Sequence, residues 1–125
     1  MRTFVTGSCG YVGSWLLPHL LADGHKVVGY DAQWFGDGYL PKPGDNENLN
    51  VIKGDIRDVP KLKEALRGAE AVVHMACVSN DHSCQLDESL STSINLDAFE
   101  PLVIAAKQAG VRRFIYASSS SVYGI

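Results

Sequence analysis

Three glycines near the amino terminus are spaced as in a turn that binds phosphate groups. Gly7, Gly10 and Gly13 follow the apolar run Thr3–Val5 and open a helical pattern over Tyr11–Ala22. In such a strand–turn–helix unit the first glycine permits a tight turn and the second lets a pyrophosphate approach the backbone. The third lets the helix pack closely on the strand, so that the N–H groups and positive dipole end of the helix face the anion. The spacing and both flanks therefore predict a dinucleotide-binding βαβ unit.

A carboxylate follows the second apolar run, Lys26–Tyr30. Asp31 lies 18 residues after Gly13, at a strand end where the ribose of an adenosine would lie. A carboxylate accepts hydrogen bonds from ribose hydroxyls and would repel a 2′-phosphate. Residues 32–41 contain no Arg or Lys to neutralise that phosphate. These residues favour NAD over NADP as the cofactor; the alternative is that Asp31 only caps a turn.

Hydrophobic periodicity predicts the strands and helices that carry these residues. Short apolar runs alternate with helical stretches, a pattern typical of a parallel α/β sheet. Strands are expected at Thr3–Val5, Lys26–Tyr30, Leu49–Lys53, Ala71–Ala76 and Phe114–Ser118, and helices at Tyr11–Ala22, Lys61–Leu66 and about Ser91–Ala109. Pro18 is expected to kink the first helix. The pattern predicts a Rossmann-type doubly wound parallel sheet with strand order 3-2-1-4-5 and right-handed crossovers.

Length and composition narrow the class of protein. The chain has 125 residues, a net charge of −3 and 46% hydrophobic residues, which fits one domain with a buried core. The absence of a basic patch argues against nucleic-acid binding, and no apolar run approaches the ~20 residues of a membrane span. The odd cysteine count favours a reducing, cytoplasmic setting. No metal is expected, because the spacing of His74, Cys77, His82 and Cys84 matches no zinc pattern.

Four separated segments carry a family resemblance. They are Thr6–Gly13, Gly54–Asp58, Val73–Ala76 and Ala117–Gly124. In these segments the chain resembles the N-terminal part of the extended short-chain dehydrogenase/reductase family. More closely, it is similar to the NAD-dependent sugar-nucleotide epimerases and dehydratases of the UDP-glucose 4-epimerase type.

The resemblance implies roles for residues on the adenosine side of a bound NAD. The backbone of Tyr11 and Val12 would meet the pyrophosphate, and Asp31 would hold the ribose. Asp55 and Ile56 would flank the adenine, with the Asp55 carboxylate accepting from the exocyclic amine.

On the nicotinamide side, the resemblance implies that the backbone of Met75, Ala76 and Cys77 borders the second ribose and its phosphate. Cys77 departs from the family pattern, which has Ala or Gly at this position. Asn95 matches an Asn of the long helix, where a structural hydrogen bond is as good an explanation as cofactor contact. The resemblance also implies that Ser118 lies next to the cofactor.

The resemblance also implies a catalytic residue. Ser119 lies four residues before Tyr123, where the family has the Ser or Thr that hydrogen-bonds the reacting sugar hydroxyl. A register error of one residue would move this role to Ser118 or Ser120, and the alternative is a merely polar strand end. Ser120 and Ser121 stand where dehydratases carry an Asp-Glu pair, which disfavours dehydration.

The family's catalytic base, a Tyr in a Tyr-x-x-x-Lys motif, is expected beyond Ile125, since none of the chain's tyrosines has Lys four residues later. Residues 1–125 are therefore expected to be a truncated NAD-binding Rossmann domain, incomplete at its C-terminal end and inactive alone. The sixth strand, the Tyr-x-x-x-Lys helix and the sugar-binding domain would be missing. Family members commonly dimerise through the long helix and the one after the serine strand, so a homodimer is expected for the full-length protein.

The expected function is NAD-dependent epimerisation of a nucleotide sugar, by transient oxidation and reduction, within a longer enzyme. Two alternatives remain open from the residues. One is a reductase or decarboxylase of the same family, and the other is a non-catalytic nucleotide-binding or sensor protein, because fold alone does not fix function.

Overall fold

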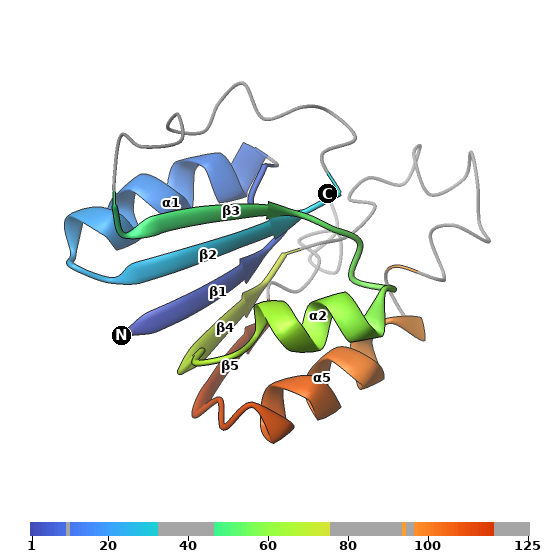
Figure 1. Cartoon of the computed structure of the whole chain (residues 1–125). Coiled ribbons are helices and arrows are strands. Elements are labelled where there is room, and N and C mark those ends of the chain that lie inside the picture. Colours follow the sequence, from blue (N-terminus) through green and yellow to red (C-terminus); the bar gives the residue numbers. More distant parts are fainter. Residues whose placement is uncertain (10, 33–46, 76–93, 95–96, 117–125) are drawn as a thin grey trace, which may run out of the picture.

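The protein is built on a five-stranded parallel sheet with the order β3-β2-β1-β4-β5 (Figure 1). The computed structural model describes residues 1–9, 11–32, 47–75, 94 and 97–116. The strands are β1 (Arg2–Thr6), β2 (Lys26–Asp31), β3 (Leu49–Lys53), β4 (Ala71–His74) and β5 (Arg113–Tyr116). The strand order confirms the predicted doubly wound sheet.

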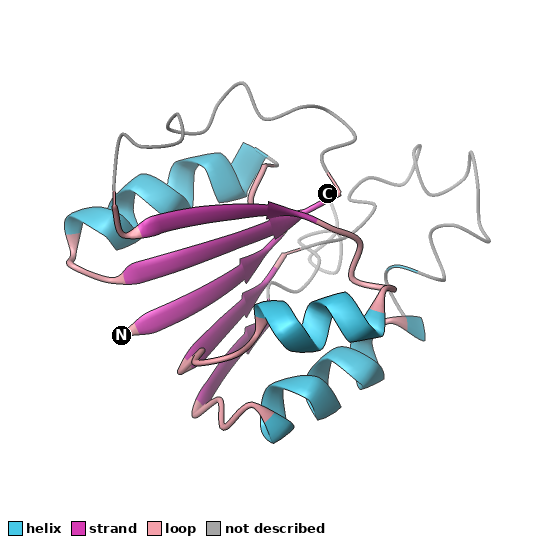
Figure 2. Cartoon of the chain, viewed as in Figure 1, coloured by secondary structure: helices cyan, strands magenta, loops and turns pink. Residues whose placement is uncertain are grey.

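Helices lie on both faces of the sheet (Figure 2). α1 (Tyr11–Ala22) lies on one face, and α2 (Val59–Ala65) and α5 (Phe99–Gln108) lie side by side on the other. α1 has the predicted bounds, and the helix continues without interruption through Pro18. Among the described residues, no helix is long and apolar enough to cross a membrane.

Several element boundaries differ from the predicted ones. α2 begins at Val59 rather than Lys61 because the Asp58 side chain accepts a hydrogen bond from the Lys61 backbone N–H, and Pro60 fits in the first turn. β4 ends at His74 rather than Ala76, although the Met75 N–H still bonds to the Thr6 carbonyl of β1. β5 begins one residue earlier than predicted. Of the predicted long helix, residues 91–93, 95 and 96 lie outside the described part.

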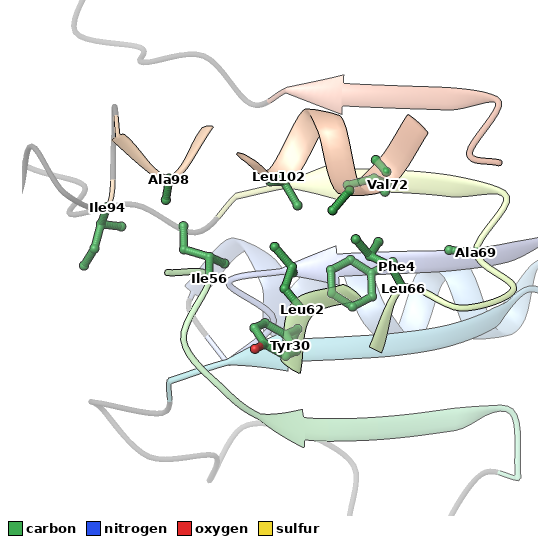
Figure 3. Close-up of a cluster of buried hydrophobic side chains, with 12 residues drawn as sticks. Phe4, Tyr30, Ile56, Leu62, Leu66, Ala69, Val72, Ile94, Ala98 and Leu102 are labelled. Carbon is green, nitrogen blue, oxygen red and sulfur yellow. The ribbon is translucent and has the colours of Figure 1, made fainter. Parts of the chain in front are cut away.

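Two apolar layers hold the helices to the sheet. The larger lies between the sheet and the pair α2 and α5, and includes Phe4, Tyr30, Leu62 and Leu102, all fully buried (Figure 3). The smaller lies under α1 and is formed by Val5, Leu17 and Val27. The layers separate because successive strand residues point to opposite faces, so that neighbours such as Phe4 and Val5 enter different cores.

Parallel register brings the carboxyl ends of the strands to one edge of the sheet. Thr6 is paired with Tyr30 of β2 and with His74 of β4, and these are paired in turn with Ile52 of β3 and Tyr116 of β5. The loops that follow the strands therefore start side by side. In open parallel sheets this edge is where ligands bind.

Candidate dinucleotide-binding site

The glycine turn joins β1 to α1 at the carboxyl edge. Gly7 has a φ of 71°, a left-handed conformation that glycine adopts at little cost, and its N–H donates to the Tyr30 carbonyl of β2 at 2.9 Å. A Cβ at Gly13 would lie 2.7 Å from the Ser8 carbonyl oxygen. The third glycine is therefore required for the close approach of helix and turn that its spacing predicted.

Asp31 lies directly against this turn. Its Oδ2 accepts a hydrogen bond of 2.9 Å from the Cys9 backbone N–H. The two features that the sequence predicted to share one ligand are thus in contact, although 22 residues separate them. The Cys9 N–H orients the carboxylate before any ligand arrives, and ionised acceptors make the stronger hydrogen bonds to hydroxyls.

The segment after β3 forms the next wall of the site. The Gly54 N–H donates to the Asp31 carbonyl at 2.9 Å, and a Cβ at Gly54 would overlap the Tyr30 ring. The Tyr30 hydroxyl donates to the Asp55 carbonyl at 3.1 Å. Burial, followed by the charges of Asp58 and Asp55, raises the pKa of Tyr30 to about 12, so this hydroxyl keeps its proton at neutral pH.

Asp55 and Ile56, the two residues expected at the adenine, have contrasting environments. The Ile56 side chain is 5% exposed and belongs to the larger core (Figure 3), which anchors the loop from below. The Asp55 carboxylate accepts hydrogen bonds from the Arg57 side chain, and these hold the pKa of Asp55 below its ordinary value. Arg57 had no predicted role, because its pairing with Asp55 depends on the conformation of the loop.

A buried hydroxyl–imidazole pair ties β1 to β4 at the same edge. Thr6 Oγ1 lies 2.7 Å from His74 Nδ1 and accepts the Met75 N–H at 3.0 Å. The His74 ring is stacked on Tyr116 and lies close to Phe99. Burial lowers the pKa of His74 to about 4, so the imidazole is neutral. The sequence predicted only that His74 lies in a strand, and the structure adds its contact with Thr6, whose hydroxyl also accepts from the Met75 backbone.

The remaining predicted site residues are only partly described. Val12 is 62% exposed at the start of α1, and the backbone of Tyr11 opens that helix. Gly10, Ala76, Cys77, Asn95, Ser118 and Ser119 lie outside the described residues, so their roles stay predictions. Within the described residues no group of three or more His, Cys, Asp or Glu side chains could hold a metal ion.

A cavity of about 550 Å³ lies at the opposite edge of the sheet. Its lining includes Arg2 and Lys26, which begin β1 and β2, and Arg67 after α2. Because the glycine turn, Asp31 and Asp55 all lie at the carboxyl ends of the strands, this cavity is not part of the candidate site.

Comparison with known proteins agrees with this geometry. The model of the NAD dependent epimerase/dehydratase family matches residues 3–125. The chain belongs to this family. The family resemblance carried by the four sequence segments is thereby confirmed, as is the NAD dependence of the family.

Curated relatives of similar identity act on different substrates. The chain is 35% identical to a UDP-glucose 4-epimerase of Mycolicibacterium smegmatis, over 99% of this chain and 41% of that protein. It is 34% identical to a 3 beta-hydroxysteroid dehydrogenase/Delta 5-->4-isomerase of Mycobacterium tuberculosis, over 97% of this chain and 32% of that protein. The chain thus spans well under half the length of these relatives.

Solved structures of family members have the same fold. A UDP-N-acetylglucosamine 4-epimerase from Methanobrevibacter ruminantium matches with a TM-score of 0.87 and 32% identity, covering 98% of this chain and 39% of that one. A double mutant of DesIV, a dTDP-glucose 4,6-dehydratase from Streptomyces venezuelae with NAD bound, matches with a TM-score of 0.90 and 32% identity, covering 99% and 41%. Both support the Rossmann-type assignment.

Proposed function

We propose that this chain binds NAD at the carboxyl edge of its sheet and forms the cofactor half of an NAD-dependent sugar-nucleotide 4-epimerase. The observation that carries the proposal is the hydrogen bond from the Cys9 N–H of the glycine turn to the Asp31 carboxylate. This hydrogen bond joins a carboxylate at a strand end to the glycine turn, which supports one shared site for the ribose and the pyrophosphate of a dinucleotide.

Different residues are proposed to bind different parts of the cofactor. The turn at Gly7 and the start of α1 supply backbone N–H groups for the pyrophosphate, and Asp31 accepts from the adenosine ribose. Bound NAD would accept and return a hydride during transient oxidation of a sugar hydroxyl. Ser119 is proposed to orient that hydroxyl by a hydrogen bond.

The nucleotide-sugar substrate is supported by the epimerases among the relatives and structural neighbours. A second candidate is oxidation of a hydroxysteroid, which the comparable identity to the mycobacterial steroid dehydrogenase favours. Both reactions remove a hydride from a secondary alcohol, so the described half of the site serves either. Dehydration is disfavoured because Ser120 and Ser121 cannot act as the acid and base of elimination.

The catalytic base, a sixth strand and the sugar-binding domain are proposed to belong to a longer protein of which residues 1–125 are the cofactor-binding part. That protein is proposed to be a homodimer.

Asp31→Ala tests the cofactor site. Loss of charge-assisted hydrogen bonds to the ribose should weaken NAD binding by about 1–3 kcal/mol, measured by calorimetric titration of residues 1–125. Asp23→Ala is the matched control, because Asp23 is an exposed carboxylate beyond the far end of α1 and its loss should leave the affinity unchanged. Equal or tighter binding of NADP by the unaltered chain would contradict the proposed NAD preference.

A further inference from the structure

An ion pair between Asp55 and Arg57 fixes a carboxylate at the carboxyl edge of the sheet. Arg57 Nε lies 2.9 Å from Asp55 Oδ1 and 3.0 Å from Oδ2, and Arg57 Nη2 also donates to Oδ2. The Arg57 backbone N–H donates to Oδ1 at 2.9 Å. Both carboxylate oxygens are therefore held by one residue.

The backbone beneath this ion pair is held as firmly as the side chain. The Asp55 carbonyl accepts from the Tyr30 hydroxyl at 3.1 Å and from the Asp58 N–H at 2.9 Å. Ile56 is anchored in the core, and Asp58 caps α2. Because the backbone and the carboxylate of Asp55 are both constrained, the carboxylate can accept a further hydrogen bond from one direction only.

That remaining capacity is small. An ionised carboxylate has about four lone-pair positions, and Arg57 makes four contacts to them with only three N–H groups, since the Nε–H is shared between both oxygens. The carboxylate can therefore still accept from about one further donor, and the Asp55 side chain is 31% exposed, so a ligand can reach it. A fixed acceptor that faces position 6 of a purine favours the amine of a 6-aminopurine and disfavours the carbonyl of a 6-oxopurine, because two acceptors then face each other. The N1–H of a 6-oxopurine is a donor, but a carboxylate that is held in place cannot turn to accept from it.

We propose that Arg57 is a positioning residue that makes the Asp55 carboxylate select a 6-aminopurine over a 6-oxopurine. The inference rests on the proposed NAD site, with the adenine amine as the donor, and it adds a specificity residue to that site. Arg57 acts through Asp55 and need not touch the cofactor. Its planar fork matters as well as its charge, since a lysine ammonium cannot make the same two-pronged contact.

The test compares NAD with nicotinamide hypoxanthine dinucleotide, which has a carbonyl in place of the 6-amino group and a proton on the neighbouring N1. Both are titrated into residues 1–125 and into Arg57→Lys, Arg57→Met and Arg67→Met, after thermal unfolding has shown that each variant is folded. The unaltered chain should bind NAD about tenfold more tightly than the hypoxanthine analogue, the effect of about one hydrogen bond. Arg57→Lys and Arg57→Met should reduce this ratio to about threefold or less, while Arg67→Met, which removes an exposed arginine at the opposite edge, should keep it.

The possible failures are distinguishable. A ratio near one in the unaltered chain, or a ratio that Arg57→Lys and Arg57→Met leave unchanged or enlarge, would overturn the role of Arg57 while leaving the NAD site in place. If the unaltered chain bound neither dinucleotide, the proposed function itself would fail, and the inference with it.

Discussion

Ser8 and Thr6 are both fully buried beside the glycine turn, yet their hydroxyl groups have different surroundings. Thr6 Oγ1 contacts His74 and accepts the Met75 N–H. Ser8 Oγ has no hydrogen-bond partner within the described part of the chain. It lies so close to β2 that a Cβ at Gly29 would be 2.8 Å from it. An unpaired buried hydroxyl costs about 1–3 kcal/mol of stability.

Replacing these hydroxyls should therefore have opposite effects on stability. Ser8→Ala should raise the free energy of unfolding by about 1 kcal/mol, because it removes a buried polar atom without removing a bond. Thr6→Val, which keeps the shape but deletes two interactions, should lower it by about 1–3 kcal/mol. Urea denaturation of both variants measures the difference, and a loss of stability in Ser8→Ala comparable to that in Thr6→Val would contradict this account of Ser8.

His74 should make the stability of the domain depend on pH. Its pKa is about 4 in the folded chain and about 6.5 when unfolded, so between these values the unfolded chain binds the extra proton. Stability is then complete above pH 6.5 and falls as the pH drops toward 4, by up to about 3 kcal/mol. His74→Asn should flatten this part of the profile in pH-dependent urea denaturation.

The control for that measurement is His19→Asn, which replaces an exposed histidine of α1 and should leave the profile unchanged. The lowered pKa of Asp55 acts in a different window. Its contribution is present above the ordinary carboxyl pKa and is lost only at lower pH, so it does not imitate the effect of His74. A profile that His74→Asn leaves unchanged would show that His74 is not buried as a neutral imidazole.

Among the elements of the fold, the short helix α2 connects the loop at the proposed adenine position to the core. Its cap residue Asp58 accepts the Lys61 N–H at 3.3 Å, and Leu62 one turn later is fully buried. The Lys61 ammonium donates back to the Lys53 carbonyl at the end of β3 at 2.5 Å. The start of α2 thus fixes the loop that carries Asp55 and Arg57.

Removing the cap should loosen this helix. Asp58→Ala should lower the free energy of unfolding by about 0.5–2 kcal/mol and speed amide hydrogen exchange in the first turn of α2. Asp58→Asn, whose side-chain oxygen can also cap, should retain most of the stability. If the two substitutions destabilised equally, the charge of Asp58, rather than its hydrogen bond to the helix, would be the main contribution.

The start of α2 also shows where sequence patterns lose precision. Helical periodicity placed the start at Lys61, because the apolar spacing becomes visible only there. The helix begins at Val59 since the cap and a proline tolerated in the first turn extend it. Such ends depend on one or two hydrogen bonds and not on the periodicity of the whole segment.

In the whole molecule, a cofactor site is proposed, but no residue of the chain is proposed to remove the substrate's proton. Ser119 is proposed to orient a hydroxyl, but an unactivated serine is a poor base. The geometry that aligns two reacting groups also depends on a substrate pocket, which is proposed to lie in the longer protein. Cofactor binding and catalysis should therefore separate experimentally.

Residues 1–125 should show no turnover with UDP-, GDP- and dTDP-sugars or with a 3β-hydroxysteroid, whereas a chain extended to the length of its relatives should act on one of these classes. In the active protein Ser119→Ala should lower kcat by about 10²–10⁴-fold, the range for a group that assists proton transfer. Epimer formation and NAD reduction are the measurements. Larger losses in Ser118→Ala or Ser120→Ala would move the catalytic position, and turnover by residues 1–125 would mean that the base is misplaced.

Sequence patterns alone predicted the order of strands and helices, the glycine turn and the position of Asp31 at a strand end. These features are local, because periodicity and glycine spacing act over a few residues and recur in every βαβ unit. They were enough to predict the parallel sheet, and the four segments that resemble the epimerase family predicted the family; both predictions are confirmed.

The contacts between side chains could not be predicted from these patterns and are seen in the folded chain. The Thr6–His74 contact joins residues 68 apart. The hydrogen bond from the Cys9 N–H to Asp31 joins the glycine turn to a different strand, and the Arg57 side chain folds back onto Asp55. The first two contacts follow from the register of neighbouring strands. The third joins residues two positions apart and follows from a loop whose conformation is held by the burial of Ile56. Packing of distant segments against one sheet sets the distances, and therefore the chemistry, at its carboxyl edge.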